Sequence, residues 1–566
     1  MPFLDWVNKN QAVTSAAQVP YHLLELKEIH GDTNSAQDNL IIQGDNLQAL
    51  KALLPFYTGK VKCVFIDPPY NTEQAFEHYD DKLEHSQWLS LMYSRLVLLR
   101  DLLADTGCLF ITISDHQVHY LKVLCDEIFG RSSFINEVSL RMKQTSGASG
   151  GGEDKRLKKN IEYLLVYVKD SASFKKFNEL FEEQDLFELI EEMESDGKSW
   201  KYTRVLKDLG EAEYLDTIQD GSGEPIKIYR HSNVVIEPIS KIAKDEKISV
   251  ENCYVKYFDK IFRDTNAQSS IRTRVMEATQ GKGDFFSIEY KPRSGRNKNK
   301  LTTLYYKGNN CDLIAWLSDV AFKKGTRLVK LEKLGTYWQG FPLNNLTKEG
   351  NVLFPNGKKP EALIQRILDL CTSKNDLILD SFLGSGTTAA VAHKMNRRYI
   401  GIEMGEHAKT HCIPRLQNVI NGEQGGISKI VNWQGGGGVS FYTLGEAVFD
   451  SNGRISENVR FNPLAAYIWL LETKTAIAIE NKEAKSPYIG EHKGVAYYLL
   501  YNGILGDRRP NGGNVLTNQV LNYLNSLNSH VGKKVVFGEA SRISEAKLSS
   551  LDIVFKQIPY ELHERV

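Results

Sequence analysis

The stretch LILDSFLGSGTTAAVAHKMNRRYIGIEM, residues 377–404, decides the fold that we expect for this chain. An apolar strand, DLILD (376–380), runs into a glycine turn, a helix follows in GTTAAVAHKM, and a second strand is predicted at RRYIGIE (397–403). Glycines at the carboxyl end of a parallel strand let a ligand approach the backbone closely. Glu403 lies roughly 20 residues beyond the turn, where an acidic residue can accept hydrogen bonds from ribose hydroxyls. The stretch indicates an α/β sheet with a nucleoside cofactor; the alternative is a tight structural turn.

Two other phosphate-binding patterns do not match this turn. No lysine follows the glycines in GSGTT, so the turn is not a P-loop. A dinucleotide site fits poorly, because the first loop position is Asp380 and the GxGxxG spacing is missing.

A second motif also ends a buried strand with polar residues. In VFIDPPYNTEQAF, residues 64–76, the apolar run is followed by Asp67, Pro68, Pro69 and Tyr70. The two prolines fix φ and remove two N–H donors, so the turn is rigid and presents carbonyls without competing donors. This motif therefore predicts a preorganised set of acceptors beside an aromatic ring.

Strands and helices alternate on both sides of these motifs. Strands are predicted at NLIIQGD (39–45), VKCVFID (61–67) and CLFITISD (108–115). The helical run SQWLSLMYSRLVLLRDLLADTG (86–107) has Ser86 as a plausible N-cap and Gly107 as its stop. Such alternation favours a doubly wound, mostly parallel sheet.

The composition is that of a globular protein, with 42% apolar residues and balanced formal charge. No run of 18 apolar residues exists and the N-terminus lacks a signal-peptide pattern, so we expect no membrane span and a cytoplasmic location. The 7 cysteines include no CxxC pair, which favours reduced thiols over disulfides and predicts no metal site.

Together the two motifs resemble the S-adenosylmethionine-dependent amino-methyltransferases. DPPY is similar to their catalytic motif and DSFLGSGTTAAVA…GIE to their cofactor motif, and DPPY comes first. That order resembles the β group of DNA adenine-N6 methyltransferases, and within it the modification subunits of type III restriction systems. The resemblance covers roughly residues 36–170 and 335–435.

The resemblance implies an α/β fold: a Rossmann-like methyltransferase sheet with circularly permuted motif order, an inserted target-recognition domain and a small C-terminal domain. We expect the following division: an N-terminal extension (1–35), a catalytic domain (36–170 plus 351–434), the recognition insert (171–350) and the C-terminal domain (435–566). It also implies S-adenosylmethionine as cofactor, double-stranded DNA as substrate, a homodimer, and a helicase-nuclease restriction subunit supplied in trans.

The chemistry explains why the catalytic motif has these residues. Adenine N6 is a poor nucleophile, because its lone pair is delocalised into the ring. The Asp67 carboxylate and the Pro68 carbonyl can accept its two hydrogens and stabilise charge in the transition state. Tyr70 can stack on the base, which must leave the duplex to be reached. An acceptor-only carboxylate suits an amino group and repels a carbonyl oxygen.

On the cofactor side, the resemblance implies roles for nine residues. The loop residues would lie beneath the methionine part, Glu403 would hold the ribose, and Asp45 would contact the adenine end or only terminate its strand. Lys359 and Pro360 open a helix that would approach the methionine carboxylate. The set is Asp45, Lys359, Pro360, Asp380, Phe382, Gly384, Gly386, Thr387 and Glu403, with Thr387 also expected to cap the following helix.

Two basic runs are candidates for phosphate contacts, or are ordinary solvated surface charge. The first follows the glycine-rich stretch SGASGGG and the second lies in the insert. They comprise Lys155, Arg156, Lys158 and Lys159, and Lys291, Arg293, Arg296, Lys298 and Lys300.

Three readings of function remain at this point. The preferred one is an adenine-N6 DNA methyltransferase. The second keeps the chemistry but acts on cytosine N4 or on RNA, although relatives that modify cytosine usually carry Ser where this chain has Asp67. The third is a non-catalytic recognition subunit, which the intact motifs disfavour.

Overall fold

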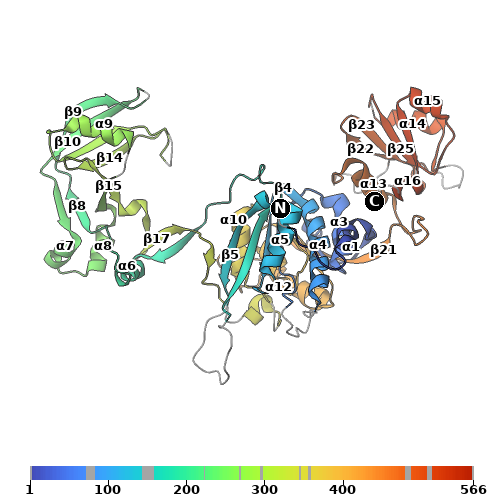
Figure 1. The fold of residues 1–566 in the computed structure, drawn as a ribbon, viewed down its shortest axis with the longest axis horizontal. Coiled ribbons are helices and arrows are strands. Elements are labelled where there is room, and N and C mark those ends of the chain that lie inside the picture. Colours follow the sequence, from blue (N-terminus) through green and yellow to red (C-terminus); the bar gives the residue numbers. More distant parts are fainter. Residues whose placement is uncertain are drawn as a thin grey trace, which may run out of the picture. The chain divides into compact units, whose positions relative to one another are not determined.

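The computed structural model describes residues 3–71, 83–142, 159–221, 223–266, 269–293, 297–342, 346–354, 358–478, 486–506, 513–528 and 530–563. The chain divides into two compact units, Met1–Asn178 with Gly335–Val566, and Glu179–Leu334 (Figure 1). The expected insert, 171–350, therefore begins and ends several residues outside the compact second unit.

A ten-stranded sheet forms the centre of the first unit, in the order β1-β21-β2-β20-β19-β3-β4-β6-β5-β18. Its strands are β1 (His22–Gly31), β2 (Asn39–Gln43), β3 (Val61–Ile66), β4 (Leu103–Ile113), β5 (Phe134–Arg141), β6 (Ile161–Val168), β18 (Tyr337–Trp338), β19 (Leu377–Asp380), β20 (Arg398–Glu403) and β21 (Gly438–Ala447). The middle strands, from β21 to β4, pair in parallel. β6 runs antiparallel to both β4 and β5, so the sheet is mixed toward that edge.

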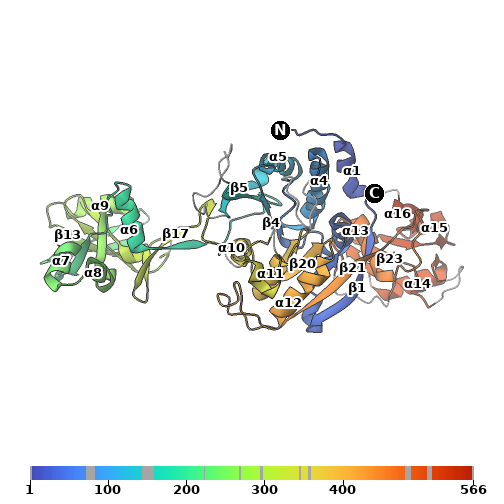
Figure 2. The same cartoon turned by 90° about the horizontal axis from the view of Figure 1, so that it is seen from below.

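Helices cover both faces of this sheet, as a doubly wound fold requires. Figure 2 shows α4 and α5 on one face and α10, α11 and α12 on the other. The helices of the unit up to this point are α1 (Lys9–Gln18), α2 (Thr33–Ala36), α3 (Asn46–Tyr57), α4 (His85–Leu102), α5 (Val118–Phe129), α10 (Glu361–Cys371), α11 (Thr387–Lys394) and α12 (Ile413–Ile420). The chain thus has a Rossmann-like α/β fold, as the sequence predicted.

The helix expected at 86–107 is shorter than its pattern. α4 ends at Leu102, and β4 begins at Leu103 because that residue pairs with Val61 of β3. Sheet pairing therefore takes the last turn that helical periodicity had assigned. The N-cap position is Glu84, and the Ser86 hydroxyl donates to its Oε1 atom, so Ser86 as N-cap was wrong.

The expected boundaries at residues 35 and 435 cut through the sheet. β1, from the expected N-terminal extension, pairs antiparallel with β21, from the expected C-terminal domain. β21 in turn pairs in parallel with β2. Both strands are thus integral to the catalytic sheet, because only there do their backbone groups find partners.

The rest of the C-terminal part carries a four-stranded sheet in the order β22-β23-β25-β27. Its elements are α13 (Phe461–Thr473), β22 (Tyr488–His492), β23 (Val495–Leu499), β24 (Val515–Leu516), α14 (Asn518–Leu527), β25 (Lys534–Gly538), β26 (Ala540–Ser541), α15 (Glu545–Ser550), β27 (Ile553–Gln557) and α16 (Tyr560–His563). One apolar cluster joins α13 to Tyr21 and Ala52, so this part packs on the catalytic part.

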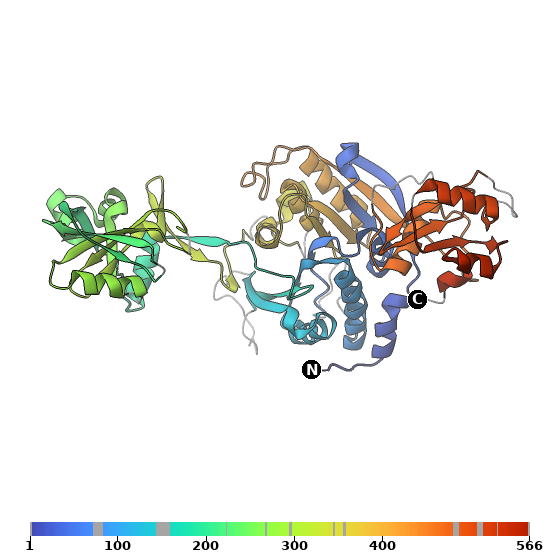
Figure 3. The same cartoon turned by 90° about the horizontal axis from the view of Figure 1, so that it is seen from above.

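The second unit is mostly antiparallel, and its strands are green in Figure 3. An eight-stranded sheet has the order β11-β8-β12-β15-β14-β13-β10-β9, and a three-stranded one the order β16-β17-β7. The strands are β7 (Phe181–Asp185), β8 (Arg204–Asp208), β9 (Glu211–Gln219), β10 (Pro225–Ser232), β11 (Val235–Pro238), β12 (Ile261–Thr265), β13 (Phe285–Tyr290), β14 (Thr302–Lys307), β15 (Asp312–Trp316), β16 (Ala321–Lys324) and β17 (Arg327–Lys333). The helices are α6 (Leu186–Ser195), α7 (Ile239–Glu246), α8 (Val250–Lys256) and α9 (Ser270–Thr279).

Candidate active site

The two sequence motifs lie at the same edge of the sheet. β3 and β19 are neighbouring parallel strands, with Cys63 opposite Ile378 and Val64 opposite Leu379. Asp67 follows β3 and Asp380 ends β19, so both carboxylates stand at adjacent carboxyl ends. From β3 the chain continues to β4 and from β19 to β20, on opposite sides, which makes this the switch point where such sheets bind ligands.

The catalytic turn is held from three directions. Asp67 Oδ1 accepts a hydrogen bond of 2.6 Å from Thr112 Oγ1, on β4. Asp67 Oδ2 forms an ion pair of 2.9 Å with Lys359 Nζ. Trp88 Nε1, on α4, donates to the Pro69 carbonyl at 2.8 Å. The side chains that fix the turn thus come from separate elements, and Thr112 and Trp88 had no sequence signal of this role.

Tyr70 belongs to the same cluster. Its hydroxyl donates to Glu162 Oε2 at 2.8 Å, and Lys359 Nζ lies 4.9 Å from the centre of its ring. Burial, with the carboxylates of Asp67 and Glu162, raises the pKa of Tyr70 well above its usual value. Glu162 was missed from the sequence, although an acidic residue inside the apolar run IEYLLVYV was a usable signal.

Lys359 lies at the catalytic turn, on Asp67 and Glu162. Its Nζ atom is 3.4 Å from Glu162 Oε2 as well as 2.9 Å from Asp67 Oδ2, and its side chain is 10% exposed. Burial alone would lower the pKa of Lys359, but the two carboxylates raise it above its usual value. The expected contact of Lys359 with a cofactor carboxylate stays a prediction.

The glycine loop has the strained backbone that glycine allows. Gly384 and Gly386 have φ of 56° and 80°, in the left-handed region. A Cβ at Gly386 would lie 3.3 Å from Cys412 Cα. Asp380 shapes the loop, since it accepts from the Phe382 N–H at 3.0 Å and from Thr388 Oγ1 at 2.6 Å. Burial raises the pKa of Asp380 to about 7.

Glu403 is tied to this loop at the end of β20. Its Oε2 accepts from the Gly384 N–H at 2.7 Å, and its Oε1 accepts from the Met404 N–H at 2.8 Å. His407 Nε2 lies 3.1 Å from Oε1. Burial would raise the pKa of Glu403, but the hydrogen bond and charge of His407 lower it overall. An ionised acceptor thus stands beside the loop where a ribose ligand was expected.

Asp45 performs a structural task at the same edge. It is the N-cap of α3, accepting from the N–H groups of Leu47 and Gln48, and it pairs with Arg95 at 3.1 Å. Asn46 Nδ2 donates to the Ser381 carbonyl at 2.9 Å, which links this turn to the glycine loop. Asp45 therefore terminates its strand, as one of the two alternatives held, and its cofactor contact stays a prediction.

The edge offers polar groups that suit a nucleoside with a charged tail. Ser381 Oγ, Ser114 Oγ and Gln117 Oε1 are buried and have no hydrogen-bond partner among the described residues. Buried polar atoms of this kind are normally satisfied, so their concentration beside the glycine loop fits a polar ligand. The residues present thus fit a cofactor of the expected class.

Thr387 does not cap α11, so that expectation was wrong. The N-cap is Gly386, and Thr387 Oγ1 accepts from Arg415 at 2.7 Å. Arg415 also pairs with Glu361 at 2.8 Å, and Lys394 pairs with Glu361 at 2.7 Å and with Glu423; all four side chains are buried. This network, first residue of α10 included, braces the loop from behind. Pro360 is the N-cap residue of α10.

The basic candidates are divided between the two units. Lys159 pairs with Asp115 at 2.5 Å in the first unit. In the second unit four exposed residues lie on the connection between β13 and β14: Lys291, Arg293, Lys298 and Lys300. Arg293 Nε lies 4.0 Å from Asp220 Oδ2. Lys155, Arg156, Lys158 and Arg296 lie outside the described residues.

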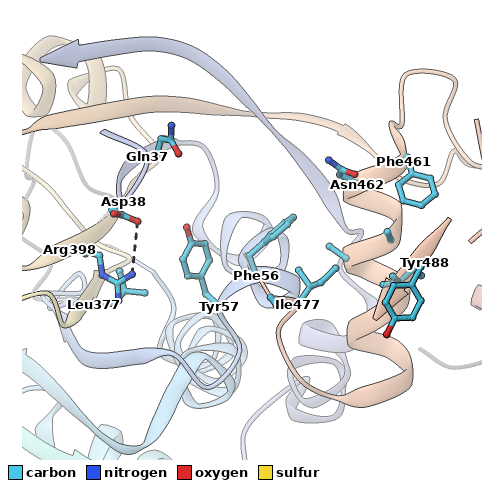
Figure 4. A pocket seen from close by; sticks show the side chains of 14 residues that line it. Gln37, Asp38, Phe56, Tyr57, Leu377, Arg398, Phe461, Asn462, Ile477 and Tyr488 are labelled. Atoms are coloured by element: carbon cyan, nitrogen blue, oxygen red, sulfur yellow. Dashed lines mark ion pairs between the residues drawn. The ribbon is translucent and has the colours of Figure 1, made fainter. Parts of the chain in front are cut away.

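A cavity of about 180 Å³ lies away from these motifs, between α3 and α13 (Figure 4). Tyr57, Phe56 and Ile477 line it, as does the Asp38–Arg398 ion pair. It contains none of the expected site residues.

Neither a metal cluster nor a spanning helix is found in the part of the chain that the structure describes. No three His, Cys, Asp or Glu side chains there could hold a metal ion. No helix there is both long and apolar enough to cross a membrane.

Comparison with known proteins gives consistent matches. A family model described as DNA methylase matches residues 61–413. The probable type III restriction-modification enzyme HindVI Mod subunit of Haemophilus influenzae is 45% identical over 410 residues, which is 72% of this chain and 54% of that protein. The type III restriction-modification enzyme EcoPI Mod subunit of Escherichia phage P1 is 28% identical over 434 residues, 70% of this chain and 62% of that protein. This chain thus spans about half to three-fifths of the length of these relatives.

Solved structures are more distant. A DNA modification methylase from Thermus thermophilus is 12% identical, covering 72% of this chain and 99% of its own, with a TM-score of 0.31. A complex of M1.HpyAVI with SAM is 13% identical, covering 67% and 98%, with a TM-score of 0.29. The family match, by contrast, spans both motifs and every strand from β3 to β20. This chain therefore belongs to the DNA methylase family.

Proposed function

We propose that this chain transfers a methyl group from S-adenosylmethionine to N6 of an adenine extruded from duplex DNA. The observation that carries the proposal is the placement of the Asp67–Tyr70 turn and the Asp380–Gly386 loop at adjacent carboxyl ends of β3 and β19. A catalytic acceptor and a cofactor loop are thereby side by side, as a transfer between two bound groups needs.

In this mechanism the chain supplies orientation and charge stabilisation. Asp67 accepts one hydrogen of the target amine and the Pro68 carbonyl accepts the other, which returns electron density to nitrogen. Thr112 holds the Asp67 carboxylate in one orientation. Tyr70 offers its ring to the extruded base, recovering about 1–3 kcal/mol of the unstacking cost. The amine proton leaves during or after transfer, so Asp67 need not deprotonate it first.

The cofactor, when bound, supplies an electrophilic methyl group on a sulfonium. Gly384 and Gly386 let it approach the loop backbone, and Glu403 is the acceptor for its ribose hydroxyls. Asp45 would face its adenine end.

The choice of adenine rests on Asp67. Relatives that act on cytosine N4 usually carry Ser at this position, so adenine is the favoured base and cytosine N4 the second candidate. The relatives named as type III Mod subunits suggest a modification subunit whose second unit, Glu179–Leu334, reads the DNA sequence. A homodimer and a restriction subunit in trans belong to the same proposal.

Purified chain with methyl-labelled S-adenosylmethionine and plasmid DNA tests the activity, and sequencing of the modified bases identifies the target. We expect N6-methyladenine at one sequence motif. Asp67→Ala should abolish transfer while cofactor binding persists. Methylcytosine alone would overturn the base assignment, and no transfer by a folded, cofactor-binding chain would support the non-catalytic alternative.

A further inference from the structure

The ammonium of Lys359 makes the contacts that the proposed function assigns to the target amine. It lies 2.9 Å from Asp67 Oδ2 and 4.9 Å from the centre of the Tyr70 ring. A nitrogen with donor hydrogens, placed on the catalytic carboxylate and over the stacking ring, is what an extruded adenine would also present. Both cannot hold Asp67 Oδ2 and the ring face in the same way at once.

A second anion lies within reach of the same ammonium. Lys359 Nζ is 3.4 Å from Glu162 Oε2, and that oxygen also accepts the Tyr70 hydroxyl at 2.8 Å. The side chains of Lys359, Asp67 and Glu162 are 10%, 18% and 18% exposed. A cation in so dry a site is costly to leave unpaired, so it can leave one carboxylate only for another.

We propose that Lys359 is a placeholder for the target amine, and that Glu162 receives it when the base enters. The amine replaces the ammonium on Asp67, and the ammonium shifts toward Glu162 without losing an anionic partner. No bond is made or broken in this exchange. Lys359 and Glu162 are thus positioning residues: they keep Asp67 oriented before the base arrives and make entry depend on a base that brings its own donor.

The inference rests on the proposed function but has its own readout, base extrusion without cofactor. The probe is a duplex carrying the mapped recognition site, with 2-aminopurine beside the target adenine, whose fluorescence rises when the neighbour unstacks. Glu162→Gln removes the receiving charge and keeps the shape, so Lys359 stays on Asp67. We expect extrusion to fall about tenfold, the scale of one hydrogen bond to a charged group.

A double-mutant cycle separates this exchange from a structural role of Glu162. Lys359→Met removes the placeholder, so adenine should be extruded at least as readily as in the unmodified chain. In that background Glu162→Gln should have no further effect. Tyr70→Phe, which removes only the hydroxyl that Glu162 accepts, is the matched control and should leave extrusion within about twofold.

The outcomes are distinct. Equal loss from Glu162→Gln in both backgrounds would overturn the exchange and assign Glu162 a structural role, with the proposed methyl transfer intact. A loss from Lys359→Met would overturn the placeholder. Failure of the unmodified chain to methylate DNA would overturn the proposed function, whatever the fluorescence of the variants.

Discussion

Thr112 donates a hydrogen bond of 2.6 Å to Asp67, from the strand beside the one that Asp67 ends. Thr112 is buried, and its Oγ1 atom has no comparable alternative to the carboxylate except the Ile66 carbonyl at 3.3 Å. The catalytic carboxylate is therefore oriented by the sheet itself.

Replacing Thr112 with Val tests this orientation. Val keeps the shape and removes the donor, so kcat for DNA methylation should fall about tenfold to a hundredfold, the scale of a hydrogen bond to a charged group. Thr112→Ser, which keeps the hydroxyl, should stay within a few-fold of the unmodified chain. Steady-state kinetics on plasmid DNA measure both, and an unchanged kcat in Thr112→Val would refute the orienting role.

Asp380 should make folding stability depend on pH. Its pKa in the fold is raised from 3.8 to about 7, so between these values the native state binds more protons than the unfolded state and stability falls as pH rises. In Asp380→Asn this loss is absent. The stability of Asp380→Asn relative to the unmodified chain should therefore improve from pH 4 to pH 8, by about 1.4 kcal/mol per unit of pKa shift as an upper scale. Urea unfolding at several pH values measures it; a difference independent of pH would contradict the raised pKa.

Gly386 should be required for the backbone path of the cofactor loop. Its φ of 80° is strained for alanine, and an added Cβ would meet Cys412 Cα at 3.3 Å. Gly386→Ala should weaken S-adenosylmethionine binding about tenfold or more, as measured by calorimetry. Gly59→Ala is the matched control, because Gly59 has a φ of 71° with nothing within 4 Å of the added atom. If both variants bind the cofactor equally well, the close approach at Gly386 is unimportant.

Lys394 should matter for stability more than its exposed counterparts. It is fully buried between Glu361 and Glu423, so Lys394→Met leaves buried carboxylates unpaired and should cost about 3–5 kcal/mol of unfolding free energy. Lys409→Met, which breaks an exposed pair with Glu28, should cost less than about 1 kcal/mol. Denaturant titrations of the two variants give the comparison, and similar small losses would show that the buried network contributes little.

The exposed lysines between β13 and β14 should contribute to DNA affinity if the second unit contacts phosphates. Changing Lys291, Lys298 and Lys300 together to Gln should lower affinity and reduce the slope of log K against log salt by about 0.9 for each phosphate that the variant no longer neutralises. Lys256→Gln is the control, because Lys256 is exposed but paired with Glu246. Fluorescence anisotropy over a salt series measures the slope; an unchanged slope would exclude phosphate binding by this connection.

The sequence by itself determined the local elements and the residue types of the site. Apolar runs bounded by Asp67 and Asp380 became β3 and β19, because buried strands and glycine turns are encoded over a few neighbouring residues. The order of the two motifs also identified the family, which the match over residues 61–413 confirmed. The placement of DPPY and of the glycine loop at strand ends needed no tertiary information.

Tertiary structure alone decided which residues meet. Leu103 leaves its helical pattern to pair with Val61, and β1 and β21 cross the expected domain boundaries to complete the sheet. Lys359 and Glu162 come from distant parts of the chain to the Asp67 carboxylate. Periodicity records only which face of an element is apolar, whereas the pairing of strands and of buried charges depends on the free energy of the whole packed sheet.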